Sequence, residues 1–180
     1  MRSLLNGPNG LTLLRVGFVP LLGVGIFSQW NDWLLLTIFL VAAITDFLDG
    51  WWARKSGLVT SFGKLADPIA DKALTGIAWI GLATLGVIPI VAAVLVMVRE
   101  VGITLLRLVF ANRVVQAADA GGKLKTTLQI VTISLLLVTP ASFPNWIWLS
   151  LDILVWVTVI VTVATGLNYL RTMQASLKND

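Results

Sequence analysis

Six long apolar stretches, separated by short polar segments, constrain the fold of this chain more than any other feature. A helix rises about 1.5 Å per residue, so about 20 apolar residues cross a hydrocarbon core of about 30 Å. The sequence therefore predicts an all-α integral membrane protein with six transmembrane helices, in one domain of residues 1–180. The expected spans are Leu11–Phe27, Trp33–Trp52, Pro68–Gly86, Ile88–Phe110, Thr126–Thr139 and Ile147–Leu170, and the fifth could extend back toward Lys123.

The composition excludes several kinds of chemistry. Hydrophobic residues make up 57% of the sequence and charged residues 12%, whereas soluble domains hold about 45–50% and about 25%. The chain contains no Cys and no His, which excludes disulfides, thiolate nucleophiles, zinc sites built from Cys or His, and an imidazole base. Any acid–base or metal chemistry therefore depends on carboxylates. The net charge of +4 is not gathered into a polar patch, so it does not indicate a nucleic-acid partner.

The distribution of Lys and Arg predicts the orientation of the spans. With the N-terminus in the cytoplasm, the outer loops are residues 28–32, 86–88 and 140–146, and none contains Lys or Arg. Cytoplasmic loops of membrane proteins carry an excess of these residues. We therefore expect an even number of spans with both termini in the cytoplasm. The inner segments hold Arg2, Arg54, Lys55, Lys64, Arg113, Lys123, Lys125, Arg171 and Lys178.

Four of the nine acidic residues fall within 26 positions, from Asp46 to Asp71. Asp46 and Asp49 are three apart, so they share a face of the second span near its inner end. Asp67 precedes a proline, which is typical of a helix start, and Asp71 follows one turn later. We expect two pairs of carboxylates to confront each other at the cytoplasmic membrane boundary.

Four close carboxylates repel one another unless divalent cations lie among them. Oxygen ligands without His or Cys favour Mg²⁺ or Mn²⁺ over zinc, and two such ions suit phosphoryl transfer. Gly50 and Gly63 would leave room for a phosphorylated ligand, and Arg54 could pair with its phosphate. Two other interpretations are carboxylates that face interfacial water and the ion site of a cation transporter or channel. Transporter sites lie near the bilayer midplane rather than at its boundary, which favours an enzyme.

The spacing Asp-x2-Asp-Gly-x2-Ala-Arg-x8-Gly-x3-Asp-x3-Asp, from Asp46 to Asp71, resembles the signature of the CDP-alcohol phosphatidyltransferase family at all eight fixed positions. The resemblance extends over nearly the whole chain. Residues 8–12, with Arg15 and Pro20, look like the opening helix of the family. The segments around residues 99–107 and 122–129 are similar to the branch that uses glycerol 3-phosphate as acceptor.

This resemblance implies a six-helix membrane enzyme, usually a homodimer, with a site open to the cytoplasm. Such enzymes displace CMP from CDP-diacylglycerol with an alcohol; here the expected product is phosphatidylglycerophosphate. Asp71 would be the general base and a metal ligand. The other implied metal ligands are Asp46, Asp49 and Asp67, and the implied CDP-diacylglycerol site is Gly50, Ala53, Arg54 and Gly63. Asn9 and Thr12 would contact the nucleotide or merely cap the first span.

Basic residues in the second half of the chain predict the acceptor pocket. Arg99 lies deep in the fourth span, where an arginine is unfavourable unless it is paired or hydrated. Glu100 is its neighbour, but adjacent helical residues are not expected to face each other. Arg107 returns to nearly the same face, and Lys123 and Lys125 precede the fifth span. The four together would bind the phosphate of an anionic acceptor such as glycerol 3-phosphate.

Other interpretations of these residues stay open. Arg99 could belong to a structural ion pair, and the two lysines could reflect membrane topology or attraction to anionic lipid. The same chemistry could also serve another acceptor, as in a cardiolipin synthase that uses phosphatidylglycerol or an inositol-phosphate transferase.

Overall fold

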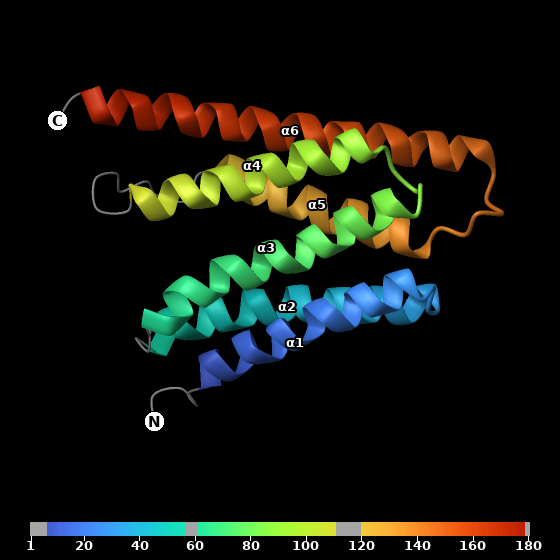
Figure 1. Ribbon diagram of the computed structural model, residues 1–180, viewed down its shortest axis with the longest axis horizontal. Helices are drawn as coiled ribbons and strands as arrows, with labels where there is room; N and C mark the ends of the chain where they lie inside the picture. The colour runs from blue at the N-terminus through green and yellow to red at the C-terminus, as the bar shows by residue number, and fades with distance from the viewer. Residues whose placement is uncertain (1–6, 57–60, 111–119, 179–180) are drawn as a thin grey trace. The chain divides into compact units, whose positions relative to one another are not determined.

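The computed structural model describes the backbone of residues 7–56, 61–110 and 120–178, and the side chains of residues 14–45, 72–110 and 121–176. Every regular element in these ranges is a helix, and there are six of them (Figure 1). For the described residues, the prediction of an all-α chain with six helices is confirmed, whereas the prediction that all six cross a membrane stays a prediction. The helices are α1 (Gly7–Phe27), α2 (Asp32–Ser56), α3 (Ser61–Thr84), α4 (Ile90–Val109), α5 (Ala120–Val138) and α6 (Asn145–Lys178).

Two helix starts differ from those expected. The prediction that a helix begins at Asp67 and Pro68 is wrong, because α3 begins at Ser61 and both residues lie inside it. A proline within a helix removes one backbone hydrogen bond, a loss that membrane helices tolerate. The fifth helix begins at Ala120, so it extends back past Lys123, and both lysines that were expected before the helix lie in its first two turns.

The breaks between helices follow from local side chains. Asn31 caps the start of α2, where its side-chain Oδ1 accepts hydrogen bonds from the backbone N–H groups of Trp33 at 3.0 Å and Leu34 at 3.4 Å. Asparagine is among the most favourable N-cap residues because it satisfies donors that have no partner within the helix. Gly86, with φ of 74°, follows α3 in the left-handed conformation that favours glycine.

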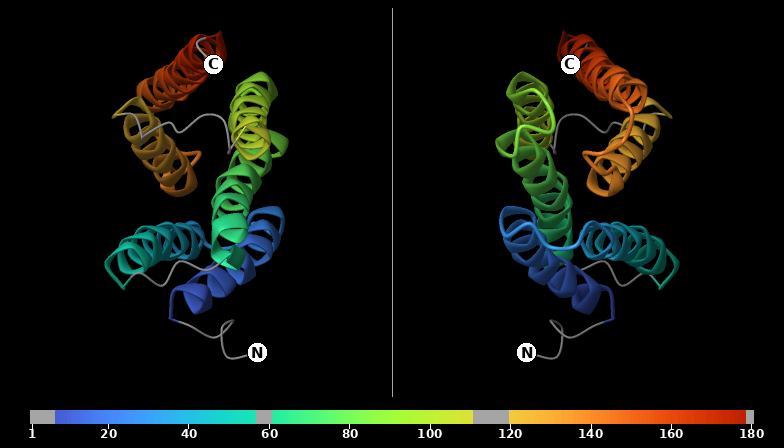
Figure 2. Two further views of the ribbon diagram at one scale, coloured as in Figure 1. Left: turned by 90° about the vertical axis from the view of Figure 1, so that its left-hand side faces the viewer. Right: turned by 90° about the vertical axis from the view of Figure 1, so that its right-hand side faces the viewer.

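The chain forms two compact units, residues 1–85 and residues 86–180. In the first unit, α1 packs against both α2 and α3 (Figures 1 and 2). Its core is made of apolar side chains from all three helices, including Leu22, Ile26, Phe39, Leu74 and Trp79. The single domain of residues 1–180 that the sequence predicts stays a prediction.

Close packing between α1 and α3 depends on Gly81. A Cβ atom at this position would lie 2.7 Å from Cγ2 of Ile26, which is a stiff β-branched side chain. We expect Gly81→Ala to destabilise the protein by about 1–3 kcal/mol, because the added methyl group overpacks this contact.

The matched control for this prediction is Gly17→Ala in α1, where a Cβ atom would meet nothing within 4 Å. Thermal unfolding in detergent should show a lower Tm for Gly81→Ala and an unchanged or higher Tm for the control. Equal Tm values for the two variants would mean that α1 and α3 do not pack closely through Gly81.

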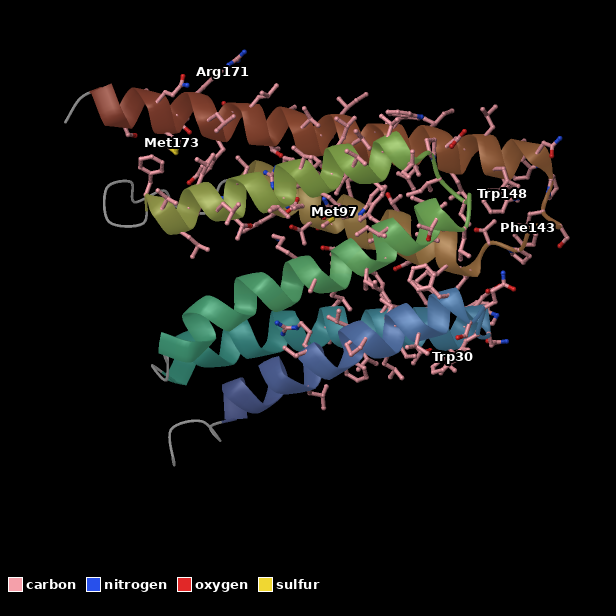
Figure 3. All side chains as sticks on the ribbon, viewed as in Figure 1. Trp30, Met97, Phe143, Trp148, Arg171 and Met173 are labelled. Atoms are coloured by element: carbon pink, nitrogen blue, oxygen red, sulfur yellow. The ribbon has the colours of Figure 1, made fainter. Side chains whose placement is uncertain are left out.

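In the second unit, α6 packs against both α4 and α5. The stretch Asn145–Ser176 of α6 is long and apolar enough to cross a bilayer, and it is the only such stretch among the residues whose side chains are described. The apolar segments Leu14–Phe27 and Asp32–Thr45 are shorter. Trp148 lies near the start of α6 and Arg171 near its opposite end (Figure 3).

Candidate functional site

The aspartate motif is divided between two neighbouring helices of the first unit. The side chains of its eight residues, and those of Asn9 and Thr12 on α1, lie outside the described residues, but their backbone positions are helical. The first half of the motif is on α2 and the second half on α3. The residues on α2 are Asp46, Asp49, Gly50, Ala53 and Arg54, and those on α3 are Gly63, Asp67 and Asp71.

The four aspartates can be placed by their distance, along each helix, from the connection between α2 and α3. Only residues 57–60 separate α2 from α3, so the end of α2 and the start of α3 lie no more than about 18 Å apart. Asp46 lies ten residues before the end of α2 and Asp71 ten residues after the start of α3, which is about 15 Å along each helix. Asp49 and Asp67 lie seven and six residues from the same helix ends, which is about 10 Å. Along their own helices, the four aspartates therefore lie at two distances from the connection, one position of each pair on α2 and the other on α3. Their role as metal ligands stays a prediction.

A polar cluster lies inside the second unit, where its centre is the carboxylate of Glu100 on α4. This residue is only 2% exposed. Its Oε1 accepts hydrogen bonds from Nη1 of Arg99 at 3.1 Å, from Nζ of Lys125 and from Nε2 of Gln129 at 3.3 Å. Both Lys125 and Gln129 belong to α5 and are buried. A single carboxylate oxygen thus joins α4 to α5 through one charged partner, Lys125, and one amide, Gln129.

Helix α6 supplies the other side of this cluster. Nε2 of Gln129 also donates to Oγ1 of Thr162 at 3.3 Å, and Nη2 of Arg99 donates to Oγ1 of Thr165 at 3.2 Å. Gly166 leaves the space that the Arg99 side chain occupies, because a Cβ atom there would lie 2.8 Å from Cγ of Arg99. Residues of α4 and α6 therefore hold the guanidinium group of Arg99, and α5 contributes through Glu100.

The expectation that Arg99 and Glu100 do not face each other is wrong. Their Cβ atoms leave the helix in different directions, but the arginine side chain is long enough to curve back to the carboxylate at 3.1 Å. The pairing explains how α4 carries an arginine in the middle of an apolar helix, since a buried charge needs a partner of opposite sign. Arg99 also keeps unused donor capacity, because its buried Nε has no hydrogen-bond partner among the described residues.

The other two basic candidates are exposed. The guanidinium carbon of Arg107 lies 4.9 Å from the centroid of the Tyr169 ring, a distance that permits a cation–π interaction. Lys123 is exposed on the first turn of α5. The structure therefore brings together Arg99 and Lys125 around Glu100. Arg107 instead packs over the ring of Tyr169 on α6.

Sequence reasoning missed the polar residues of α6 in this cluster. A usable signal was present, because Thr158, Thr162 and Thr165 recur at intervals of four and three in the otherwise apolar stretch of residues 153–167. This spacing puts polar groups on one face. Thr158 also makes a fully buried hydrogen bond of 2.8 Å to Thr132 on α5, so the stripe marks the side of α6 that faces its neighbours.

Comparisons with known proteins identify relatives over almost the whole chain. Residues 5–165 match the family model described as "CDP-alcohol phosphatidyltransferase". A Mycobacterium tuberculosis protein named "Probable phosphatidylglycerophosphate synthase" is 41% identical over 91% of this chain and 79% of its own length. A Bacillus subtilis protein named "CDP-diacylglycerol–glycerol-3-phosphate 3-phosphatidyltransferase" is 35% identical over 97% of this chain and 98% of its own length. A Rickettsia bellii protein with the same name is 36% identical over 92% and 94%, respectively.

Proposed function

Because the chain belongs to the CDP-alcohol phosphatidyltransferase family, we propose that it transfers the phosphatidyl group of CDP-diacylglycerol to sn-glycerol 3-phosphate. The products are phosphatidylglycerophosphate and CMP, and the protein is a transferase of phospholipid biosynthesis. The relatives named for this reaction align with 97% and 92% of the chain. The match therefore includes both the aspartate motif and the polar cluster around Glu100.

The main observation in favour of glycerol 3-phosphate as the acceptor is the buried cationic side chain of Arg99. It is held by Glu100 and Thr165, and its Nε has no hydrogen-bond partner among the described residues. The described part of the cluster contains two cations and one carboxylate, which is an excess of one positive charge. An anion with several acceptor oxygens, such as a phosphate monoester, matches both the charge and the donors. Arg99, Arg107, Lys123 and Lys125 are the proposed phosphate-binding residues.

The donor set of the aspartate motif fits a divalent cation. The chain offers no His or Cys ligand, and the four aspartates lie in pairs on α2 and α3, at similar distances along each helix from the connection between them. Asp46, Asp49, Asp67 and Asp71 would hold Mg²⁺ or Mn²⁺, as two ions, through oxygen ligands. The chemistry that such ions supply is neutralisation of charge on the pyrophosphate.

In the proposed reaction, the acceptor hydroxyl attacks the β-phosphorus of CDP-diacylglycerol and CMP leaves. The hydroxyl must lose a proton as the new P–O bond forms, and Asp71 takes it as the general base. Gly50, Ala53, Arg54 and Gly63 line the CDP-diacylglycerol site, with Asn9 and Thr12 on α1 near the nucleotide. The basic residues of the second unit hold the phosphate of the acceptor.

The same proposal includes the topology. All six helices span the cytoplasmic membrane, both termini lie in the cytoplasm, and the site opens at the cytoplasmic boundary. Many large apolar side chains on the outer faces of the helices are exposed, among them Val98, Val109 and Ile160, which suits contact with lipid. A homodimer within the membrane is also proposed, from the family resemblance.

Arg107→Ala is expected to raise the KM for glycerol 3-phosphate about tenfold, because a charge-assisted hydrogen bond to phosphate is lost. The KM for CDP-diacylglycerol should change less than twofold, as measured in mixed micelles. The matched control is Arg171→Ala, which removes an exposed arginine at the basic end of α6. An equal rise in both KM values for Arg107→Ala would place this residue outside the acceptor pocket.

The acceptor is tested by CMP release from CDP-diacylglycerol with purified protein and a panel of alcohols. The panel is glycerol 3-phosphate, phosphatidylglycerol, inositol phosphate and serine. Release with glycerol 3-phosphate alone is the expected result. Release with a different acceptor would refute the proposed function of the basic residues, and no release with any acceptor by folded protein would favour cation transport.

A further inference from the structure

We infer that Glu100 is a positioning residue for the acceptor, because its carboxylate orients the two buried cations, Arg99 and Lys125. This inference rests on the proposed function, and it assigns a role to an acidic residue in a pocket that binds an anion. A carboxylate would repel the phosphate of the acceptor, so Glu100 is not itself a phosphate ligand. Its contribution must come through the groups that it holds.

The contacts of Glu100 support this role. Its Oε1 accepts from Arg99, Lys125 and Gln129, so one atom fixes three donors from two helices. Long lysine and arginine side chains lose much conformational entropy when they are ordered. A carboxylate that orders them before the acceptor arrives removes part of this loss from the binding step.

A second hydrogen bond of Arg99 fixes the orientation of its guanidinium group. The Nη1 group is bound to Glu100 and Nη2 is bound to Thr165 on α6, while Gly166 permits the side chain to lie against that helix. Because Nη1 and Nη2 are both hydrogen-bonded, the guanidinium plane of Arg99 has a fixed orientation. The remaining N–H donors then point in a constant direction, which bidentate recognition of a phosphate requires.

Glu100 also balances the positive charges of Arg99 and Lys125. Two cations buried side by side without a counter-ion would repel each other. One carboxylate that contacts both of them keeps them close together. Glu100 therefore allows the pocket to present two cationic groups to a doubly charged phosphate.

The test is a double-mutant cycle made with Glu100→Gln, Lys125→Met and the double variant. Each purified protein is assayed for the KM of both substrates by CMP release. Glu100→Gln keeps the shape of the side chain but removes its charge. We expect it to raise the KM for glycerol 3-phosphate about tenfold or more, as the loss of hydrogen bonds to charged groups implies, with the KM for CDP-diacylglycerol changed less than twofold.

If Glu100 acts through Lys125, the effects of the two substitutions do not multiply. We expect Glu100→Gln to raise the acceptor KM by less than about threefold when Lys125→Met is already present. Fully multiplicative effects, or equal changes in the KM of both substrates, would overturn the inference. Wild-type protein that releases no CMP with glycerol 3-phosphate would instead overturn the proposed function, so the two failures are distinguishable.

Thr132→Val is the control for general loosening of the second unit. It removes a buried hydrogen bond of 2.8 Å between α5 and α6, and it should lower the Tm without changing the acceptor KM. A raised acceptor KM in this control would mean that helix packing alone controls acceptor binding.

Gln129→Leu keeps the inference testable if Glu100→Gln does not fold, because it removes one donor to Oε1 and leaves both ion pairs intact. The acceptor KM should then rise about threefold, and an unchanged value would contradict the role of Glu100.

Discussion

Turnover of the Asp71→Asn variant is expected to fall by about a hundredfold to ten-thousandfold, while most of its affinity for CDP-diacylglycerol remains. This range is typical for the loss of a general base. The chain contains no His and no Cys, so only another carboxylate could take the proton at neutral pH. An asparagine retains the size of the side chain and one of its oxygen atoms, which limits the disturbance of the donor site.

The measurement for Asp71→Asn combines CMP release with equilibrium binding of CDP-diacylglycerol in the same detergent. Asp32→Asn is the matched control, because Asp32 is an exposed aspartate at the start of α2 and lies outside the motif. The control should keep wild-type turnover. Wild-type turnover in Asp71→Asn would refute the general-base assignment, whereas loss of donor binding together with turnover would reduce Asp71 to a ligand of the donor complex.

Removal of divalent cations is expected to abolish CMP release completely. Four carboxylates that share one site repel one another when the cations that neutralise them are absent, and the pyrophosphate adds further negative charge. Excess EDTA should therefore stop turnover, and addition of Mg²⁺ or Mn²⁺ beyond the chelator should restore it.

EDTA that has been saturated with Mg²⁺ before addition is the control for effects of the chelator on the detergent micelles. Full turnover in metal-free EDTA would contradict the metal assignment of all four aspartates. A bound metal ion stabilises the folded state. A Tm that falls in EDTA for the wild type, but not for Asp46→Asn, would therefore support the metal assignment independently of turnover.

The sequence predicted the helices well because the signal for each is local. An apolar run of sufficient length has few alternatives to a helix in a membrane, and all six expected stretches contain a helix. The start of α3 was missed because Asp67 and Pro68 form a favourable helix start in isolation. The backbone continues seven residues back from Pro68 to Ser61, and local cap preferences do not exclude such an extension.

The placement of the aspartate motif on two successive helices could be predicted for the same reason, because its spacing spans one helix pair with a short connection. Its role as a site stays a prediction. The partners of Arg99 could not be predicted in this way. Glu100 meets Lys125 and Gln129, which lie 25 and 29 residues along the chain, and such contacts depend on how α4, α5 and α6 pack.

The contact between Arg99 and Glu100 shows a further limit of rules based on helix faces. Those rules describe the directions of Cβ atoms, whereas a guanidinium group lies several bonds from its backbone. Gly81 and Gly166 give a related example, because each accommodates a side chain from another helix. A glycine in a sequence does not reveal which neighbour occupies the space above it.

Identification of the lipid product tests the central claim most directly. Purified protein is incubated with CDP-diacylglycerol, glycerol 3-phosphate and Mg²⁺ or Mn²⁺, and the lipids are analysed by mass spectrometry while CMP is quantified. The account predicts phosphatidylglycerophosphate and CMP in equal amounts, both dependent on glycerol 3-phosphate. Formation of phosphatidic acid and CMP without incorporation of glycerol 3-phosphate would contradict it, because the protein would then transfer the phosphatidyl group to water.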